Sequence, residues 1–317
     1  MPGSSTTRCD RDALLLLMMF HCLLEIASGS TQEWTYHMKG AIQVMKYYRN
    51  LYPGPRDVAF SPEVVKFVHI FFIEKDTFLR TTTMPFNDTE KDDFDSLRWS
   101  TEISSLFPFL NSGNPTRADP CMGLSPELLD IISSINERAR DQLTSGRPEI
   151  NYTLLDTLKS RLHKLELIRE TSDQAQLVYL NSIAFQEATW IYLHHIVGNQ
   201  PRESEVIQRF HLPKLLEIIE SIHQAQGIHL CYMPYPMWAL FIASCVVPEE
   251  RRVRILELFA LLKQKKPMSN VPSTLCAVEA IWKRRDLEAE GTHRYSTAHQ
   301  NLWVDVISQL GWKMSLT

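Results

Sequence analysis

Three aspartates stand close together in the first third of the chain: Asp92, Asp93 and Asp95. Carboxylates are the side chains that hold Mg²⁺, and a magnesium–diphosphate site needs two sets of them converging from two helices. No second set of Asn, Ser or Glu ligands follows at helical spacing further along the chain. The sequence therefore favours a solvated acidic loop at this position.

Histidines are the next candidates for chemistry. His194 and His195 are adjacent, so they point to different faces of a helix and cannot form a metal pair on one face. Whether His211, on a later segment, meets them in space stays open at this point. Neutral, hydrogen-bonded histidines at the end of a helix are the favoured interpretation.

The six cysteines do not form a metal-binding pattern. No two of them make a CxxC pair, the usual half of a structural zinc site. The sequence also lacks GxSxG, GxxxxGK[ST], GxGxxG and HExxH motifs. We therefore predict no catalytic residue, no metal site and no cofactor. Four cysteines lie among apolar residues, where free thiols behave as small hydrophobes, and this favours a reducing compartment: Cys22, Cys231, Cys245 and Cys276.

Large aromatic residues could line a pocket for an apolar effector. The candidate wall residues are Trp190, Tyr192, Trp238 and Phe241. Ligand pockets are lined mainly by such rings, but core packing is their default role. We favour core packing and keep the effector pocket as an alternative.

The elements that must position these side chains are predicted to be helices. Leu and Ile recur at the spacing of one helix face, and 11 glycines are few for a sheet-rich fold. We expect an all-α fold: a multi-helix bundle or superhelical array of about ten or more helices, forming one domain over residues 1–317. Residues 80–123 lack this periodicity and are expected to form an irregular loop or connection.

An apolar run near the N-terminus, residues 13–24, superficially matches a secretory signal. Asp10 and Asp12 precede the run and His21 interrupts it. The run is also shorter than the ~20 residues that a membrane span needs. We interpret it as a helix of a globular protein that ends near Gly29, and we predict no membrane segment.

The formal charge is 33 − 37 = −4, which gives no broad attraction for polyphosphate. Basic residues do gather locally. Solvated helix faces and helix C-termini are the favoured interpretation, and a nuclear-import patch is the alternative. The basic runs are Arg251, Arg252 and Arg254; Lys263, Lys265 and Lys266; and Lys283, Arg284 and Arg285.

Four segments resemble, in the right order, motifs of the fungal-specific transcription factor domain. Residues 238–252 resemble W-x-L-F-I-A-G-x … E-x-x-R, with Ser244 where that family often has Gly. Residues 278–286 resemble V-x-x-x-W-x-x-R-D, and residues 303–312 resemble the closing W-x-x-V segment and its Gly. Residues 23–41 resemble L-E-I-x-S-G-S … W-x-x-H-x-x-G-A.

This resemblance implies an all-α regulatory domain, in the nucleus of a filamentous fungus, that follows a binuclear zinc cluster with six cysteines. The cluster requires CxxC halves that this sequence lacks. DNA contact is therefore expected only indirectly, or through a missing N-terminal cluster. The helix predicted from Ala13 begins close to Met1, which favours a truncated N-terminus over a relative without a cluster.

The resemblance implies a regulatory effector domain whose partners are the transcription machinery or another transcription regulator. An apolar small-molecule effector and a homodimer are further partner expectations. Two other classes remain as alternatives: an all-α enzyme of terpene-synthase type, which requires Asp92, Asp93 and Asp95 on a helix facing a magnesium-filled cavity, and a purely structural interaction module.

Overall fold

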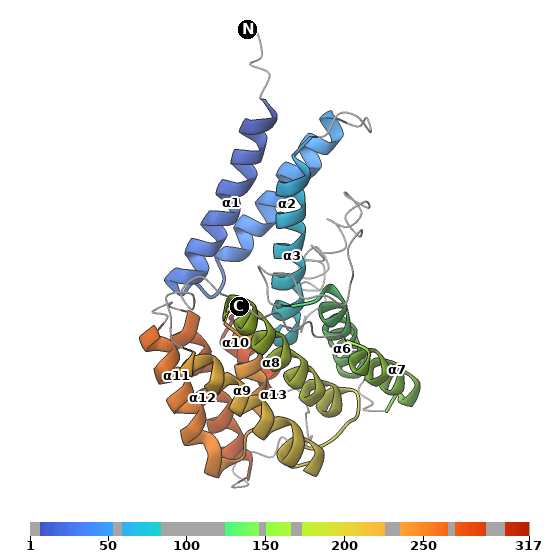
Figure 1. Ribbon diagram of the computed structural model, residues 1–317, viewed down its shortest axis with the longest axis vertical. Helices are drawn as coiled ribbons and strands as arrows, with labels where there is room; N and C mark the ends of the chain where they lie inside the picture. Colours follow the sequence, from blue (N-terminus) through green and yellow to red (C-terminus); the bar gives the residue numbers. More distant parts are fainter. Residues whose placement is uncertain are drawn as a thin grey trace.

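The computed structural model describes residues 7–52, 59–83, 124–145, 150–165, 173–225, 235–265, 270–289 and 302–316. Within these ranges all regular structure is helical, which confirms the predicted all-α array (Figure 1). The helices are α1 (Arg8–Ser28), α2 (Trp34–Leu51), α3 (Pro62–Thr82), α6 (Pro126–Ser145), α7 (Tyr152–His163), α8 (Asp173–Ile196), the π-helical η2 (Val206–His211), α9 (Leu212–Gln224), α10 (Met237–Val246), the 3₁₀ turn η4 (Glu249–Arg251), α11 (Arg252–Lys265), α12 (Asn270–Ala289) and α13 (Leu302–Gln309).

Local signals explain the two ends of α1. Thr7 and Asp10 form a reciprocal capping box, in which the Thr7 hydroxyl accepts from the Asp10 backbone at 3.2 Å. The helix therefore begins about five residues before the apolar run from Ala13. Gly29 ends it in the left-handed conformation with φ 89°, which glycine adopts without steric cost.

Helix α3 begins with Pro62 in its first turn, where the missing N–H has no partner to lose. It continues through Thr82, so residues 80–82 are helical instead of belonging to the expected connection. The rest of that connection, including Asp92, Asp93 and Asp95, lies outside the described residues.

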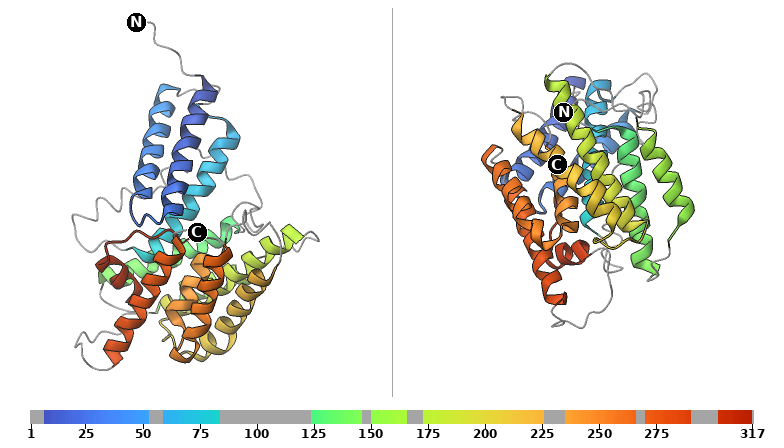
Figure 2. Two further views of the ribbon diagram at one scale, coloured as in Figure 1. Left: turned by 90° about the vertical axis from the view of Figure 1, so that its left-hand side faces the viewer. Right: turned by 60° about the horizontal axis from the view of Figure 1, so that its bottom comes forward.

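The described helices pack around two hydrophobic cores. The smaller core holds α1 and α2 against the first half of α3, and we call these three helices the N-terminal lobe. The larger core joins helices from α6 to α13, which we call the body. Helix α3 belongs to both, because Phe71 and Phe72 pack in the lobe while Phe78 packs in the body. Figures 1 and 2 show the lobe projecting from the broader body along the long axis.

Helix α10 lies at the centre of the body. All ten of its residues are buried, from Met237 to Val246, which is the state expected of a helix that is apolar on every side. None of the helices in the described ranges combines the length and the apolar character that crossing a membrane requires.

Candidate functional site

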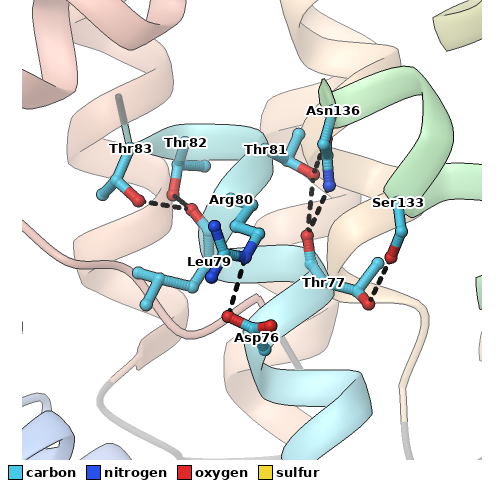
Figure 3. Close-up of polar contacts among 9 residues, drawn as sticks. All are labelled: Asp76, Thr77, Leu79, Arg80, Thr81, Thr82, Thr83, Ser133 and Asn136. Carbon is cyan, nitrogen blue, oxygen red and sulfur yellow. Dashed lines mark hydrogen bonds and ion pairs between the residues drawn. The ribbon is translucent and has the colours of Figure 1, made fainter. Parts of the chain in front are cut away.

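A buried polar network lies where α3 passes from the lobe into the body (Figure 3). The Asn136 amide of α6 donates to the Thr77 carbonyl at 2.8 Å, and its oxygen accepts from the Thr81 hydroxyl at 3.2 Å. Thr77 also contacts Ser133 through their hydroxyls at 3.1 Å. Because both threonines sit on one face of α3, four residues apart, a single amide side chain joins α6 to two turns of α3.

Three aromatic side chains from the body complete this network. Tyr192 of α8 donates its hydroxyl to Asn136 at 2.8 Å. The indole N–H of Trp238, on α10, donates to the Thr81 hydroxyl at 3.1 Å, and that of Trp303, on α13, donates to the Thr81 carbonyl at 3.0 Å. Thr81 is thus the point where α3, α6, α10 and α13 meet.

The rings around Trp238 pack closely. Phe78 and Phe185 stack on it with centroid separations of 5.4 and 6.0 Å, and Tyr192 meets it edge-on at 5.9 Å. Such aromatic pairs contribute about 0.5–1.5 kcal/mol each beyond their buried area. The N–H and O–H groups of these rings all have partners, so the arrangement stabilises a fixed junction between helices.

The electrostatics of this centre do not favour proton transfer at neutral pH. Burial raises the pKa of Tyr192, so its phenol stays protonated. Burial likewise raises the pKa of the nearby Cys245 thiol, which remains a small neutral side chain. Among the described residues, no group of three or more His, Cys, Asp or Glu side chains is arranged to hold a metal ion.

The structure brings together only some of the predicted pocket residues. Tyr192 and Trp238 share the polar network, and Phe241 lies buried on the same helix as Trp238. Trp190 belongs to a different group, two residues before Tyr192 on α8 and therefore on another face. That these four residues line an effector cavity stays a prediction.

Trp190 is surrounded by histidines. Its ring lies 4.8 Å from that of His163, 6.0 Å from His194 and 5.7 Å from His211, with the His211 ring nearly parallel at 9°. The question left open by the sequence is thereby answered: His194 and His211 do meet, at 5.8 Å between centroids. His195 points elsewhere: its Nδ1–H donates to the Gln200 carbonyl at 2.9 Å.

The histidine group around Trp190 is held by a buried carboxylate. Glu187 bonds His211 at 2.8 Å and Lys214 at 2.5 Å. Burial alone raises the pKa of Glu187, but these two hydrogen bonds outweigh it and leave the pKa below its usual value. Burial, together with the nearby charges of Lys159 and His211, lowers the pKa of His194 to about 4, so this ring is neutral at pH 7.

Most of the arginines in two predicted basic runs make contacts within the chain. Arg252 forms a bidentate ion pair with Asp286, with N···O distances of 2.6 and 2.7 Å. Its guanidinium carbon lies 5.3 Å from the centroid of the Trp282 ring. Arg254 pairs in the same way with Glu220, and Arg285 donates to the Cys245 carbonyl at the end of α10. These side chains connect α9, α10, α11 and α12.

The tryptophans of the motif segments have a similar structural role. Trp282 donates to the Ser244 carbonyl at 2.9 Å, and Trp34 donates to the Lys313 carbonyl at 2.8 Å, which links the lobe to the C-terminal segment. The spaced motifs in the sequence therefore mark side chains that bind elements far apart along the chain.

Sequence patterns do not single out the polar residues at the centre of the site, namely Thr77, Thr81 and Asn136. The one available signal was a polar residue recurring four positions apart on an apolar helix face, at Thr77 and Thr81. That signal is hidden because the sequence assigns residues 80–123, and with them Thr81, to an irregular connection. Asn136 has no local signal, since its partners lie 55 to 59 residues away.

Comparison with known proteins identifies the chain at the level of a family. The family model for the fungal specific transcription factor domain matches residues 2–317. No curated protein and no solved structure matches the chain. The match covers almost the whole sequence, including the motif tryptophans and arginines that hold the described helices together. The chain therefore belongs to the fungal specific transcription factor domain family.

Proposed function

We propose that this protein is a regulatory effector domain that acts in the nucleus by binding the transcription machinery or another transcription regulator. The observation that carries the proposal is the family match over residues 2–317. The motif residues support it, because Trp238, Trp282 and Trp303 all anchor the helical body. The proposal includes no catalytic step and no zinc-cluster DNA contact by these 317 residues, which lack CxxC pairs.

A tethering assay tests this role. Residues 1–317 are fused to an unrelated DNA-binding domain, and transcription of a reporter with the matching site is measured in a fungal host. We expect transcription to change relative to the DNA-binding domain alone. A Trp238→Ala fusion, in which the body is destabilised, should lose the effect. Unchanged reporter transcription by a stably expressed wild-type fusion would contradict the regulatory role.

The nuclear location is tested separately with a fluorescent fusion in fungal cells. We expect nuclear accumulation that persists when Lys263 and Lys283, two lysines of the basic runs, are each changed to Gln. Exclusion of the wild-type fusion from the nucleus would count against this part of the proposal.

An apolar small-molecule effector is a second candidate mode of action. It is supported by the concentration of rings at Tyr192, Trp238 and Phe241 in the interior of the body. A ligand at about 100 times its Kd adds about 2.7 kcal/mol to the free energy of unfolding. We therefore expect lipophilic cell extracts to raise the Tm of the wild-type protein, and the absence of any shift would oppose this mode.

A further inference from the structure

Helix α1 carries apolar side chains on two sides, although only one side packs against the lobe. Leu15, Met19 and Cys22 are buried in the lobe core. On the other side Leu17 is 54% exposed, and Phe20 and Leu24 are each 62% exposed. A helix that is apolar on both sides is normally covered on both sides.

One row of exposed and partly exposed residues runs along α1, beside other exposed residues such as Cys9 and Leu14. The positions alternate by three and four residues, which is the heptad spacing of a helix that packs along another helix. Its members are Asp10, Ala13, Leu17, Phe20, Leu24 and Ala27, and we call them the α1 stripe. The pattern distinguishes the stripe from single exposed apolar residues such as Phe210, which are normal on protein surfaces.

Among the described residues, every member of the stripe is exposed or partly exposed. In Figure 1, α1 forms the outer edge of the lobe, and the left view of Figure 2 shows it in front of α2 and α3 with no other described helix over it. A partner helix could therefore lie along α1 without displacing any described helix.

We propose that two copies of this protein associate through the α1 stripe, with their α1 helices antiparallel. A symmetric contact uses the same patch on both subunits, so it covers two apolar stripes at once. Asp10 is the one charged member of the stripe, and antiparallel pairing centred on Leu17 places it opposite Leu24 of the other copy instead of opposite the other Asp10.

The charges at the two ends of α1 favour the antiparallel arrangement. Arg8, in the first turn, is exposed and has no ion-pair partner within the described ranges. The last turn contains Glu25 and no basic residue, so the partial negative charge of the helix C-terminus is not offset within α1. Antiparallel pairing centred on Leu17 brings Arg8 of each copy beside the last turn of the other.

The apolar area exposed by the stripe and by the neighbouring Leu14 sets the expected strength of association. The exposed parts of Leu14, Leu17, Phe20 and Leu24 amount to on the order of 400 Å² per copy, as for a functional surface patch. Two copies would bury about twice this apolar area, below the ~1,200–2,000 Å² of stable complexes. We therefore expect a reversible dimer with a Kd in the micromolar range.

The first test compares two glutamate substitutions at phenylalanines of nearly equal exposure. Phe20→Glu places a charge in the stripe, and Phe210→Glu places one on η2, where Phe210 is 64% exposed. Sedimentation equilibrium is measured for the wild type and both variants from about 1 to about 100 µM, with circular dichroism to verify folding. We expect masses that rise from 36.7 kDa toward twice that value for the wild type and Phe210→Glu. For Phe20→Glu we expect the Kd to rise by about tenfold or more.

The second test addresses orientation by exchanging charges. Arg8→Glu and Glu25→Arg should each weaken the dimer by about threefold, and the double variant should restore it. Each single change improves the match of α1 to its own helix dipole. Because Glu25→Arg also removes the 3.9 Å contact between Glu25 and His37 of α2, circular dichroism is recorded for every variant to verify that α1 stays folded.

A wild-type protein that stays monomeric throughout this range would overturn the proposal and leave the stripe to a partner of another kind. A dimer that is insensitive to Phe20→Glu would also overturn it, and a double variant that is not restored would overturn the antiparallel arrangement. Self-association is measured without transcription, so this outcome is independent of the proposed regulatory role.

Discussion

The lobe and the body each bury a tryptophan completely, but they use it differently. Trp34 belongs to the lobe core together with Met19, Met38 and Met45, and its indole N–H donates to the Lys313 carbonyl. Trp238 in the body lies between stacked rings, and its N–H enters the network of Thr81 and Asn136. A side chain of one type and one degree of burial therefore links α2 to the C-terminal segment in one region and joins α10 to α3 and α8 in the other.

Two tryptophans that are equally buried can therefore connect different sets of helices, so the burial of a side chain does not by itself show which helices it holds together. The lobe core is held mainly by packing between neighbouring helices, and methionines such as Met19, Met38 and Met45 adapt to irregular gaps there. The body adds satisfied polar groups to its rings, and these fix which helix faces meet. The lobe should consequently tolerate substitutions that the body does not.

The largest expected effect comes from truncating the two tryptophans. Trp238→Ala removes a fully buried ring and its hydrogen bond, and we expect the free energy of unfolding to fall by about 3–5 kcal/mol across the body. Trp34→Ala should loosen mainly the lobe. Hydrogen exchange distinguishes the two cases: Trp34→Ala should speed exchange in α1 and α2 while α8 and α10 stay protected. If Trp34→Ala speeds exchange equally in α1, α2, α8 and α10, the lobe and the body do not depend on separate tryptophans.

The next effect concerns polar residues of the two regions. Asn136→Leu removes one donor to the Thr77 carbonyl and the acceptor of the Tyr192 hydroxyl, and we expect the free energy of unfolding to fall by about 2–4 kcal/mol. Thr35→Val in the lobe removes only a bond to Gln32, within the same turn, and should cost less than about 1 kcal/mol. Chemical denaturation measures both values. Similar losses of stability for the two variants would show that the polar network around Asn136 stabilises the body no more than one local hydrogen bond stabilises the lobe.

A pH-dependent effect is expected from His194 in the body. Its pKa is lowered from 6.5 to about 4 in the folded protein, first by burial and then by the charges of Lys159 and His211. Between these values the unfolded chain binds a proton that the folded chain does not, so stability falls as pH drops from 6.5 to 4. In His194→Gln this loss should shrink by about 1–3 kcal/mol.

Denaturation curves at a series of pH values measure this dependence, and they should be flatter for His194→Gln than for the wild type. If His194→Gln follows the wild-type curve instead, the neutral buried state of His194 is not a source of acid sensitivity.

The smallest effects are expected at two glycines. A methyl group at Gly198, in the body, would lie 2.7 Å from the His194 carbonyl oxygen, which is backbone and cannot easily move. We expect Gly198→Ala to lower stability by about 1–2 kcal/mol. A methyl group at Gly40, in the lobe, would meet only the flexible end of Met18 at 2.6 Å. Gly40→Ala should stay within about 0.5 kcal/mol of the wild type, because the gain in helix propensity offsets the shift of Met18.

Differential scanning calorimetry of the two alanine variants gives the comparison directly. A larger loss at Gly40 than at Gly198 would mean that the lobe core is as rigid as the body.

Several features of this protein followed from the sequence by itself. The helices were predictable because their signals are local: Pro62 at the start of α3, the apolar run of α10 and the periodic residues of α8 all lie within the elements they define. The family was predictable because its motifs are spaced along one chain. The start of α1 and the end of α3 were missed, although the Thr7–Asp10 capping box at the start of α1 is itself a local signal.

Only the tertiary structure decided which helix faces meet. Thr81 binds Trp238, 157 residues away, and Trp303, 222 residues away, and no periodic pattern carries information over such separations. The same limit explains why His211 joins Trp190, and why Arg252 faces Asp286. A pattern of apolar residues fixes the buried side of a helix, but the partner on that side depends on how all the helices pack at once.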